Sequence, residues 1–217
     1  MNEDRLQRMR IVYSVGEAVK YISHLDLLRA WERILRRAEV PLAYSHGYNP
    51  HPRLVIAMPL PVGCTGAQEV VDAYLYEPMT PAALLEALDG QTPEGIAVVA
   101  AREVGLGGPA LPSVIEHAVY RIALDGVREA DVERRTAELM GHQRLEVTFR
   151  RKTYDLRPLV GSLHVAEEGG EVVLEAELLR LPSGRIGRPD VLLEVLGLLA
   201  HARCICRARI AFDVPQV

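Results

Sequence analysis

Aromatic residues and long apolar runs are both scarce in this sequence. Only two Phe and one Trp occur among 217 residues, so the hydrophobic cores must consist mainly of Leu, Val, Ile and Ala. No run of about 18 apolar residues exists and the start is mostly polar, so we expect no signal peptide and no contact with a membrane. The net charge of −4 argues against a protein that is basic throughout, although it permits local basic patches.

Cysteine is also rare, and its odd number limits the possible chemistry. Three Cys without a signal peptide indicate free thiols in the reducing cytoplasm, where we expect the protein to reside. Cys204 and Cys206 could in principle bind zinc or an iron–sulfur cluster with His201 and Cys64. Three thiolates are fewer than the four of an ordinary cluster, and no C-x-x-x-C-x-x-C motif for S-adenosylmethionine chemistry occurs. We expect Cys204 and Cys206 to be reduced, buried and metal-free, and we expect no cofactor.

Three common enzyme motifs are missing. The loop Pro61–Gly66 contains Gly but lacks the Lys-Ser/Thr of a phosphate-binding loop, and it does not open a dinucleotide-binding helix. No G-x-S-x-G motif occurs, which argues against a serine hydrolase.

The first half of the sequence predicts the element order β-α-β-β-α-β. Apolar residues at helical spacing, among them Trp31, Ile34 and Leu35, indicate the first helix. Thr80 and Pro81 are typical of the start of the second. The expected elements are a strand at 10–15, a helix at 25–39, a strand at 69–76, a helix at 80–88 and a strand at 96–101. The segments 42–45 and 54–58 could be short strands that flank a turn.

A Gly- and Pro-rich segment, V-G-L-G-G-P-A-L-P from Val104 to Pro112, precedes a return of the same element order. The expected elements are strands at 117–124, 145–149, 172–178 and 204–212 and helices at 129–140 and 189–199. This order predicts an α+β fold of two tandem ferredoxin-like (β-α-β-β-α-β) domains, each an antiparallel sheet with both helices on one face. The expected parts are a flexible N-terminus at 1–9, domains at 10–103 and 115–217, and a linker at 104–114.

An unusual turn lies between Tyr44 and Arg53. Its ten residues include two His, two Pro, two Tyr, an Asn and a Gly, a mixture that neither a helix nor a central strand favours. Loops of this kind more often position functional groups than pack a core. Tyr44 and Tyr48 could stack on a nucleic-acid base or simply pack the turn.

Two basic stretches are candidate phosphate contacts. Arg29, Arg33, Arg36 and Arg37 fall within about 100° of arc on the first helix. Such a stripe suits phosphate binding, since the planar guanidinium matches phosphate oxygens, although a solvated helix face is the alternative. The run Arg150-Arg151-Lys152 could equally be the charged edge of an exposed hairpin.

Three His residues could act as metal ligands or as general acids and bases. The spacings between His24, His46 and His51, 22 and 5 residues, match no metal-binding motif. We expect His24 to anchor the start of its helix, together with Ser23 and Asp26. Catalysis by one of the three His is the alternative.

Several strings together resemble the radical-SAM-linked protein family, a bacterial domain of unknown function. The resemblance covers nearly the whole chain from Met9 onward. It rests on Y-I-S-H-L-D-L at 21–27, Arg36-Arg37, Y-S-H-G-Y-N-P-H-P at 44–52, P-L-P-V-G at 59–63, Glu69 with Asp72, and Y-D-L-R-P-L at 154–159.

The resemblance implies a partner protein. Family members occur alone or joined to the end of a radical-SAM enzyme with a cobalamin-binding-type region, often encoded near RNA-processing genes. The family has no established catalytic residues. We therefore expect a non-catalytic partner domain of a radical-SAM enzyme that binds or presents RNA. An endoribonuclease-like enzyme, suggested by fold-level analogy alone, and a protein-only adaptor are the alternatives.

The expected RNA- or partner-binding residues come from the first helix with its Arg stripe, from the His- and Pro-rich turn, and from the Y-D-L-R-P-L string. They are His24, Asp26, Arg29, Arg33, Arg36, Arg37, Tyr44, Ser45, Tyr48, Asn49, His51, Arg53, Asp155 and Arg157.

Overall fold

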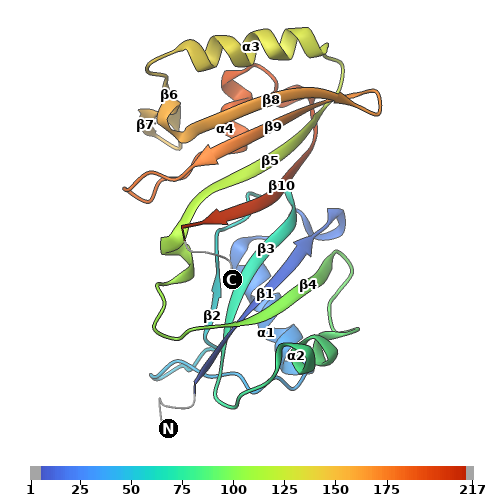
Figure 1. Ribbon diagram of the computed structural model, residues 1–217, viewed down its shortest axis with the longest axis vertical. Coiled ribbons are helices and arrows are strands. Elements are labelled where there is room, and N and C mark those ends of the chain that lie inside the picture. Colours follow the sequence, from blue (N-terminus) through green and yellow to red (C-terminus); the bar gives the residue numbers. More distant parts are fainter. Residues whose placement is uncertain (1–5, 214–217) are drawn as a thin grey trace. The chain divides into compact units, whose positions relative to one another are not determined.

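The computed structural model describes residues 6–213, and the chain divides between Val114 and Ile115 into two units (Figure 1). Unit 1 is Met1–Val114 and unit 2 is Ile115–Val217. The segment 104–114, expected to be a linker, forms the end of unit 1 and closes with the 3-10 helix η3 (Leu111–Val114). Of the expected flexible terminus, residues 7–9 instead belong to a strand, and residues 1–5 lie outside the described residues.

The described part of unit 1 has the element order β-α-β-β-α-β. Its elements are β1 (Gln7–Val15), η2 (Glu17–Val19), α1 (His24–Arg37), β2 (Leu54–Ile56), β3 (Thr65–Leu75), α2 (Pro81–Leu88) and β4 (Ile96–Val104). The strands lie in the order β4-β1-β3-β2, and every neighbouring pair is antiparallel. The strand expected at 42–45 is reduced to isolated bridges, because Pro52 opposite Tyr44 has no N–H to extend a ladder.

The core of unit 1 lies between the helices and one face of the sheet. Side chains alternate along a strand, so every second residue of β1 points toward the helices. Both helices contribute to this one cluster, which places them on the same face of the sheet (Figure 1). Burial of one large apolar side chain contributes roughly 1.5–3 kcal/mol to the free energy of folding. The main contributors are Met9, Ile11, Tyr13, Trp31, Ile34, Leu35, Leu84 and Leu88.

The opposite face of the same sheet carries a buried ion cluster. Asp72 on β3 is fully buried, and its carboxylate accepts hydrogen bonds from the Nε atoms of Arg8 and Arg10, each at 2.8 Å. The second nitrogens of both guanidiniums, the Nη2 atoms, also donate to Oδ2 of Asp72. Arg8 further donates to the carbonyl oxygen of Pro109 at 3.2 Å, which ties the segment 104–114 to this cluster.

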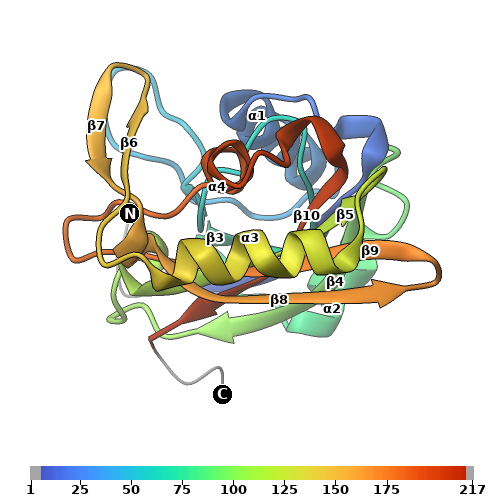
Figure 2. The same ribbon diagram turned by 90° about the horizontal axis from the view of Figure 1, so that it is seen from above.

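The sheet strands of unit 2 are antiparallel as well. Its elements are β5 (Ile115–Leu124), α3 (Glu129–Gly141), β6 (Glu146–Phe149), β7 (Lys152–Asp155), η4 (Arg157–Leu159), β8 (Val160–Glu168), β9 (Glu171–Leu179), α4 (Pro189–Val195), η5 (Leu199–His201) and β10 (Ala202–Phe212). The sheet order is β10-β5-β9-β8. Among the described residues, strands β6 and β7 pair only with each other, and they extend away from α3 as a separate ribbon (Figure 2).

Two expectations for unit 2 are wrong. The segment 145–149 does not join the sheet; the strand that does is β8, whose residues are mostly half-buried or exposed and so lack an apolar signal. Cys204 and Cys206 are half-buried rather than buried, because β10 does not alternate between a buried and an exposed face here: Cys204, Ile205 and Cys206 are all half-buried.

The α+β fold with antiparallel sheets is confirmed by this arrangement. In residues 6–213, no helix has both the length and the apolar character that crossing a bilayer requires. Within the same range, no group of three or more His, Cys, Asp or Glu side chains could hold a metal ion.

Candidate nucleic-acid interface

The outer face of α1 displays the expected Arg stripe, but its members differ in their contacts. All four Arg side chains are exposed. Arg29 donates to Oδ1 of Asp26 at 3.2 Å, and Arg37 donates to the carbonyl oxygen of Gln91. Arg33 makes no hydrogen bond or ion pair within the described part of the chain, and the contact of Arg36 is with an aromatic ring. Arg33 and Arg36 therefore keep their donors available for a ligand.

Asp26 serves the start of α1. The hydroxyl of Ser23 accepts from the backbone N–H of Asp26 at 3.2 Å and donates to Oδ2 of Asp26 at 2.7 Å. The hydrogen bond from Ser23, followed by the effects of Arg29 and Arg33, holds the pKa of Asp26 below its usual value of 3.8. Asp26 is thus ionised at neutral pH and offsets part of the stripe's charge.

The His- and Pro-rich turn is a loop closed at its base. The backbone N–H of Ser45 donates to the carbonyl oxygen of His51 at 2.8 Å, and the N–H of His51 donates back to Oγ of Ser45 at 3.1 Å. Gly47, near the tip, has a φ of 137°, a region that side-chain-bearing residues rarely adopt. The residues between Ser45 and His51 are all exposed, so the sequence folds here into a clamped loop rather than a strand.

Tyr48 is fully exposed on this loop. Its relative exposure is 105%, so the ring has no packing role in unit 1. Tyr44 behaves differently: it packs against the core, and the guanidinium carbon of Arg36 lies 5.9 Å from its ring centroid. This contact places the base of the loop beside the Arg-bearing face of α1. The loop follows α1 in light blue in Figure 1.

Arg53 lies apart from the stripe. Its guanidinium carbon is 4.4 Å from the ring centroid of Tyr74, the β3 residue that pairs with Arg8 of β1. Tyr74 belongs to the sheet face that carries Asp72, whereas α1 covers the other face. The structure therefore does not bring Arg53 together with the four Arg of α1.

The three His differ in their surroundings. Nδ1 of His24 is inaccessible and has no hydrogen-bond partner among the described residues. The cavity beside it measures about 10 Å³, room for roughly one water molecule and no substrate. His46 and His51 are exposed on the loop, and no hydrogen bond joins any two of the three within residues 6–213.

Asp155 and Arg157 belong to unit 2 and hold its backbone. Oδ1 of Asp155 accepts from the N–H groups of Leu145 at 2.8 Å and Arg157 at 3.0 Å. The Arg157 side chain donates to the carbonyl oxygen of Val160 at 2.8 Å. Both side chains are half-buried, and their place in an interface stays a prediction.

Three exposed apolar residues near the start of α1 were not predicted from the sequence. They are Tyr21, Leu25 and Val62. A Cβ added at Gly63 would lie 3.6 Å from the Tyr21 ring, so the P-L-P-V-G string lies against this Tyr. The sequence contains a signal for two of them, because the Y-I-S-H-L-D-L string places Tyr21 before the helix and Leu25 outside its buried positions.

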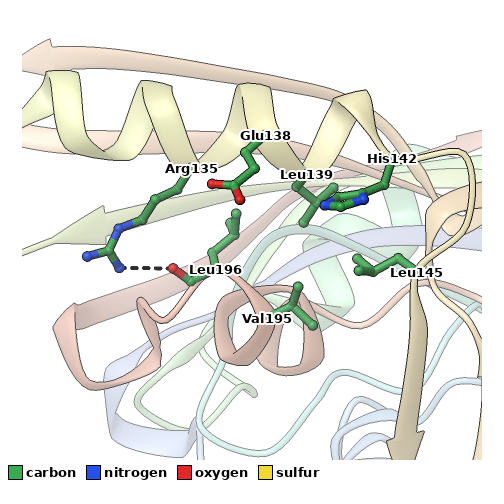
Figure 3. Close-up of a pocket in the computed structure, with 7 residues that line it drawn as sticks. All are labelled: Arg135, Glu138, Leu139, His142, Leu145, Val195 and Leu196. Carbon is green, nitrogen blue, oxygen red and sulfur yellow. Dashed lines mark hydrogen bonds between the residues drawn. The ribbon is translucent and has the colours of Figure 1, made fainter.

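Unit 2 contains a pocket of about 280 Å³ between α3 and α4 (Figure 3). Nη1 of Arg135 donates to the carbonyl oxygens of Leu196 at 2.9 Å and Gly197 at 3.0 Å, and so closes the C-terminal end of α4. None of the residues expected to bind RNA or a partner lines this pocket. Its lining residues are Arg135, Glu138, Leu139, His142, Leu145, Val195 and Leu196.

Comparison with known proteins identifies a family match. A family model described as an uncharacterized protein conserved in bacteria (DUF2344) matches residues 8–189. None of the curated proteins matches the chain.

Among solved structures, the chain resembles one chain of a crystal structure of a Cbf5-Nop10-Gar1 complex. The TM-score is 0.50 at 14% identity, over 95% of this chain and 49% of that chain, so the chain spans about half the length of its neighbour. At this identity the likeness shows the fold alone. A crystal structure of an unknown protein from Galdieria sulphuraria covers 90% of both chains at 14% identity, but its TM-score of 0.28 is too low for any conclusion.

Proposed function

We propose that this chain, which belongs to the DUF2344 family of uncharacterized proteins conserved in bacteria, binds RNA through unit 1 as the non-catalytic partner of a modifying enzyme. In this function Arg33 and Arg36 contact the phosphate backbone. Tyr48 stacks on an unpaired base.

The observation that carries this proposal is the exposed ring of Tyr48 on a clamped loop beside the Arg-bearing face of α1. A solvent-exposed aromatic ring contributes nothing to the core, whereas every nucleic-acid base offers a face on which it can stack. Sequence-tolerant stacking with backbone contacts is typical of proteins that bind single-stranded RNA. Asn49 and His51 add hydrogen-bonding groups at the same loop.

Replacing Tyr48 with Ala is expected to weaken binding of a labelled, unstructured single-stranded RNA. Removing one base–aromatic stack costs about 1–3 kcal/mol, which is roughly a 5- to 150-fold rise in Kd. The salt dependence of binding should stay the same, because the substitution removes no charge. Fluorescence anisotropy titrations at several salt concentrations measure both quantities.

Tyr48→Phe is the matched control, since it keeps the ring and should bind RNA as the wild type does. Equal affinities of the wild type and the Ala variant would contradict a stacking role for Tyr48.

Replacing Arg33 and Arg36 together with Gln is expected to flatten the salt dependence. Removing one phosphate contact lowers the slope of log K against log salt by about 0.7 for a single strand, so the slope of the double variant should fall by about 1.4. Arg29→Gln with Arg37→Gln is the charge-matched control on the same helix. It should change the slope less, because those two side chains are held by Asp26 and Gln91.

Thermal melting should first establish that both double variants are folded. Slopes that fall equally in the two variants would show that Arg33 and Arg36 are not specifically engaged with RNA.

The enzyme partner in this proposal is a radical-SAM protein. Support comes from the strings S-H-L-D and G-Y-N-P-H-P, which resemble radical-SAM-linked proteins and which form the start of α1 and the exposed loop. The protein would act in the cytoplasm. Co-purification with a radical-SAM protein from the same bacterium, followed by sequencing of bound RNA, tests both halves of the proposal.

A second candidate function is that of a protein-only adaptor. The specific observation that favours it is the exposed apolar group formed by Tyr21, Leu25 and Val62, a composition suited to a protein interface. If the wild-type protein shows no salt-dependent RNA binding at low ionic strength, alone or with its enzyme partner, the RNA proposal is wrong. The adaptor function then replaces it.

We also assign each unit to the ferredoxin-like fold. The support is the element order β-α-β-β-α-β in unit 1, with strand order β4-β1-β3-β2. Unit 2 has the corresponding order β10-β5-β9-β8, with the β6–β7 ribbon as an insertion. One fold can serve many functions, so the fold is compatible with the proposal without requiring it.

A further inference from the structure

The turn of the β6–β7 hairpin has an unfavourable backbone conformation for its sequence. Arg150 and Arg151 alone connect the two strands, and both have positive φ, 48° and 65°. Two-residue hairpin turns with positive φ at both positions favour Asn-Gly, because other residues incur a steric penalty of roughly 1–2 kcal/mol each. Turn chemistry alone therefore does not account for two Arg at this position, and strained positions of this kind gather at functional sites.

The tip of the hairpin carries a concentrated positive charge. Arg150, Arg151 and the adjacent Lys152 are exposed. Within residues 6–213 none of the three forms an ion pair; Arg150 instead contacts the Phe149 ring, whose centroid lies 5.3 Å from its guanidinium carbon. These three cations are therefore available to an anionic ligand.

One face of the hairpin combines aromatic rings with further Arg side chains. The pairing of Val147 with Tyr154 and of Phe149 with Lys152 places these four residues on the same face. The segment between β9 and α4 covers two of the rings: the Arg185 carbon lies 4.1 Å from the Tyr154 centroid, and the Arg188 carbon lies 4.6 Å from that of Phe149. Nε and Nη2 of Arg188 donate to the carboxylate of Asp190 at 3.0 and 2.8 Å, so this guanidinium supports the face of the hairpin and is not counted among the phosphate contacts.

The base of the hairpin is held in place. An isolated two-stranded hairpin is marginally stable, so the ribbon needs support. The carboxylate of Asp155 accepts two backbone N–H groups, and the N–H of Leu156 donates to the carbonyl oxygen of Leu145 at 2.8 Å. On the other face the hydroxyls of Thr148 and Thr153 share a hydrogen bond of 2.9 Å. The ribbon thus extends from the sheet of unit 2 as a clamped element (Figure 2).

From these observations we propose that the β6–β7 hairpin is a second RNA-contacting element, which binds the phosphate backbone through Arg150, Arg151 and Lys152. The inference rests on the proposed function, since it assumes that the protein binds RNA. It adds a site in unit 2 that is independent of the loop and helix of unit 1. The contacts are to phosphates, so this site adds affinity and salt dependence without selecting a base sequence.

The test replaces Arg150 with Asn and Arg151 with Gly. The Asn-Gly pair suits positive φ at both positions, so the hairpin should remain folded and the Tm should stay equal or rise. The salt slope for single-stranded RNA should fall by about 1.4, since two phosphate contacts are removed at about 0.7 each, and the affinity at low salt should fall with it. Because the turn is not weakened, weaker binding cannot be attributed to a damaged hairpin.

Arg128→Gln with Arg134→Gln is the charge-matched control. These side chains lie at the start and middle of α3, away from the hairpin, which follows the C-terminal end of that helix. Their replacement should leave the salt slope closer to that of the wild type. If the Asn-Gly variant keeps the wild-type slope while wild-type protein binds RNA, this inference is overturned and the function of unit 1 stands. Binding to vesicles that contain phosphatidylserine is measured in parallel. The inference is also overturned if the Asn-Gly variant binds RNA as the wild type does and is weakened only in binding to these vesicles. Absence of any RNA binding by the wild type overturns both.

Discussion

Replacing Asp72 with Ala is expected to lower the free energy of unfolding of unit 1 by about 3–5 kcal/mol. The carboxylate is fully buried and receives hydrogen bonds from both Arg8 and Arg10. Removal of the carboxylate leaves two buried guanidiniums without the anion that both of them contact. Desolvated charge of this kind is expensive because the low-dielectric surroundings cannot replace water.

The single Trp of the chain provides the measurement. Trp31 is fully buried in unit 1, so its fluorescence follows the unfolding of this unit in urea. Glu77→Ala is the matched control, since Glu77 is an exposed acidic residue just beyond β3, and it should change stability by less than about 0.5 kcal/mol. A decrease below about 1 kcal/mol for the Asp72 variant would mean that the ion cluster does not stabilise unit 1.

Replacing Trp31 with Ala is expected to lower the free energy of unfolding of unit 1 by about 3–5 kcal/mol. The indole is fully buried and meets the ring of Tyr13 edge-to-face, with centroids 4.8 Å apart and an interplanar angle of 69°. Truncation removes this contact and leaves a large cavity between α1 and β1. The remaining side chains can fill it only in part, because the flanking residues are themselves fixed in the core.

Trp31→Phe should be much milder. Nε1 of Trp31 has no hydrogen-bond partner among the described residues, so the substitution removes a buried polar group that is not satisfied. The smaller ring still packs against Tyr13. We expect the free energies of unfolding of the Ala and Phe variants to differ by at least about 2 kcal/mol. The Ala variant loses most of the buried apolar surface and leaves a cavity, whereas the Phe variant keeps an aromatic ring in place. Far-UV circular dichroism during urea unfolding measures the stability of both variants. Equal decreases in their free energies of unfolding would contradict this account.

Under the proposed function, RNA binding and stability depend on different parts of unit 1. The ion cluster and the Trp31 core secure the two faces of the sheet, whereas Tyr48, Arg33 and Arg36 contribute little to packing. Variants of the first group should therefore unfold more easily, and variants of the second group should melt as the wild type does. Weaker RNA binding by a variant of the second group can therefore be attributed to the lost contact and not to unfolding.

The amino-acid pattern predicted elements whose signals are local. The first helix follows from its apolar spacing and from Ser23, and the alternation of β9 follows from its apolar positions. Strand β8 was missed because an edge strand with mostly half-buried and exposed residues has no strong period-2 pattern. The first strand of the β6–β7 hairpin was expected in the sheet because nothing in a short strand shows what it will pair with.

The sequence by itself determined the α+β character of the chain, the amphipathic α1 with its four Arg, and the loop rich in His, Pro and Tyr. These follow from backbone geometry, in which the repeat of a helix or strand sorts neighbouring residues onto faces. Only the tertiary structure decided that Arg37 is held by Gln91, that Arg53 lies over Tyr74, and that Asp72 is buried between two Arg. Each of these contacts joins residues distant in the chain, and such partners are selected by how the whole unit packs.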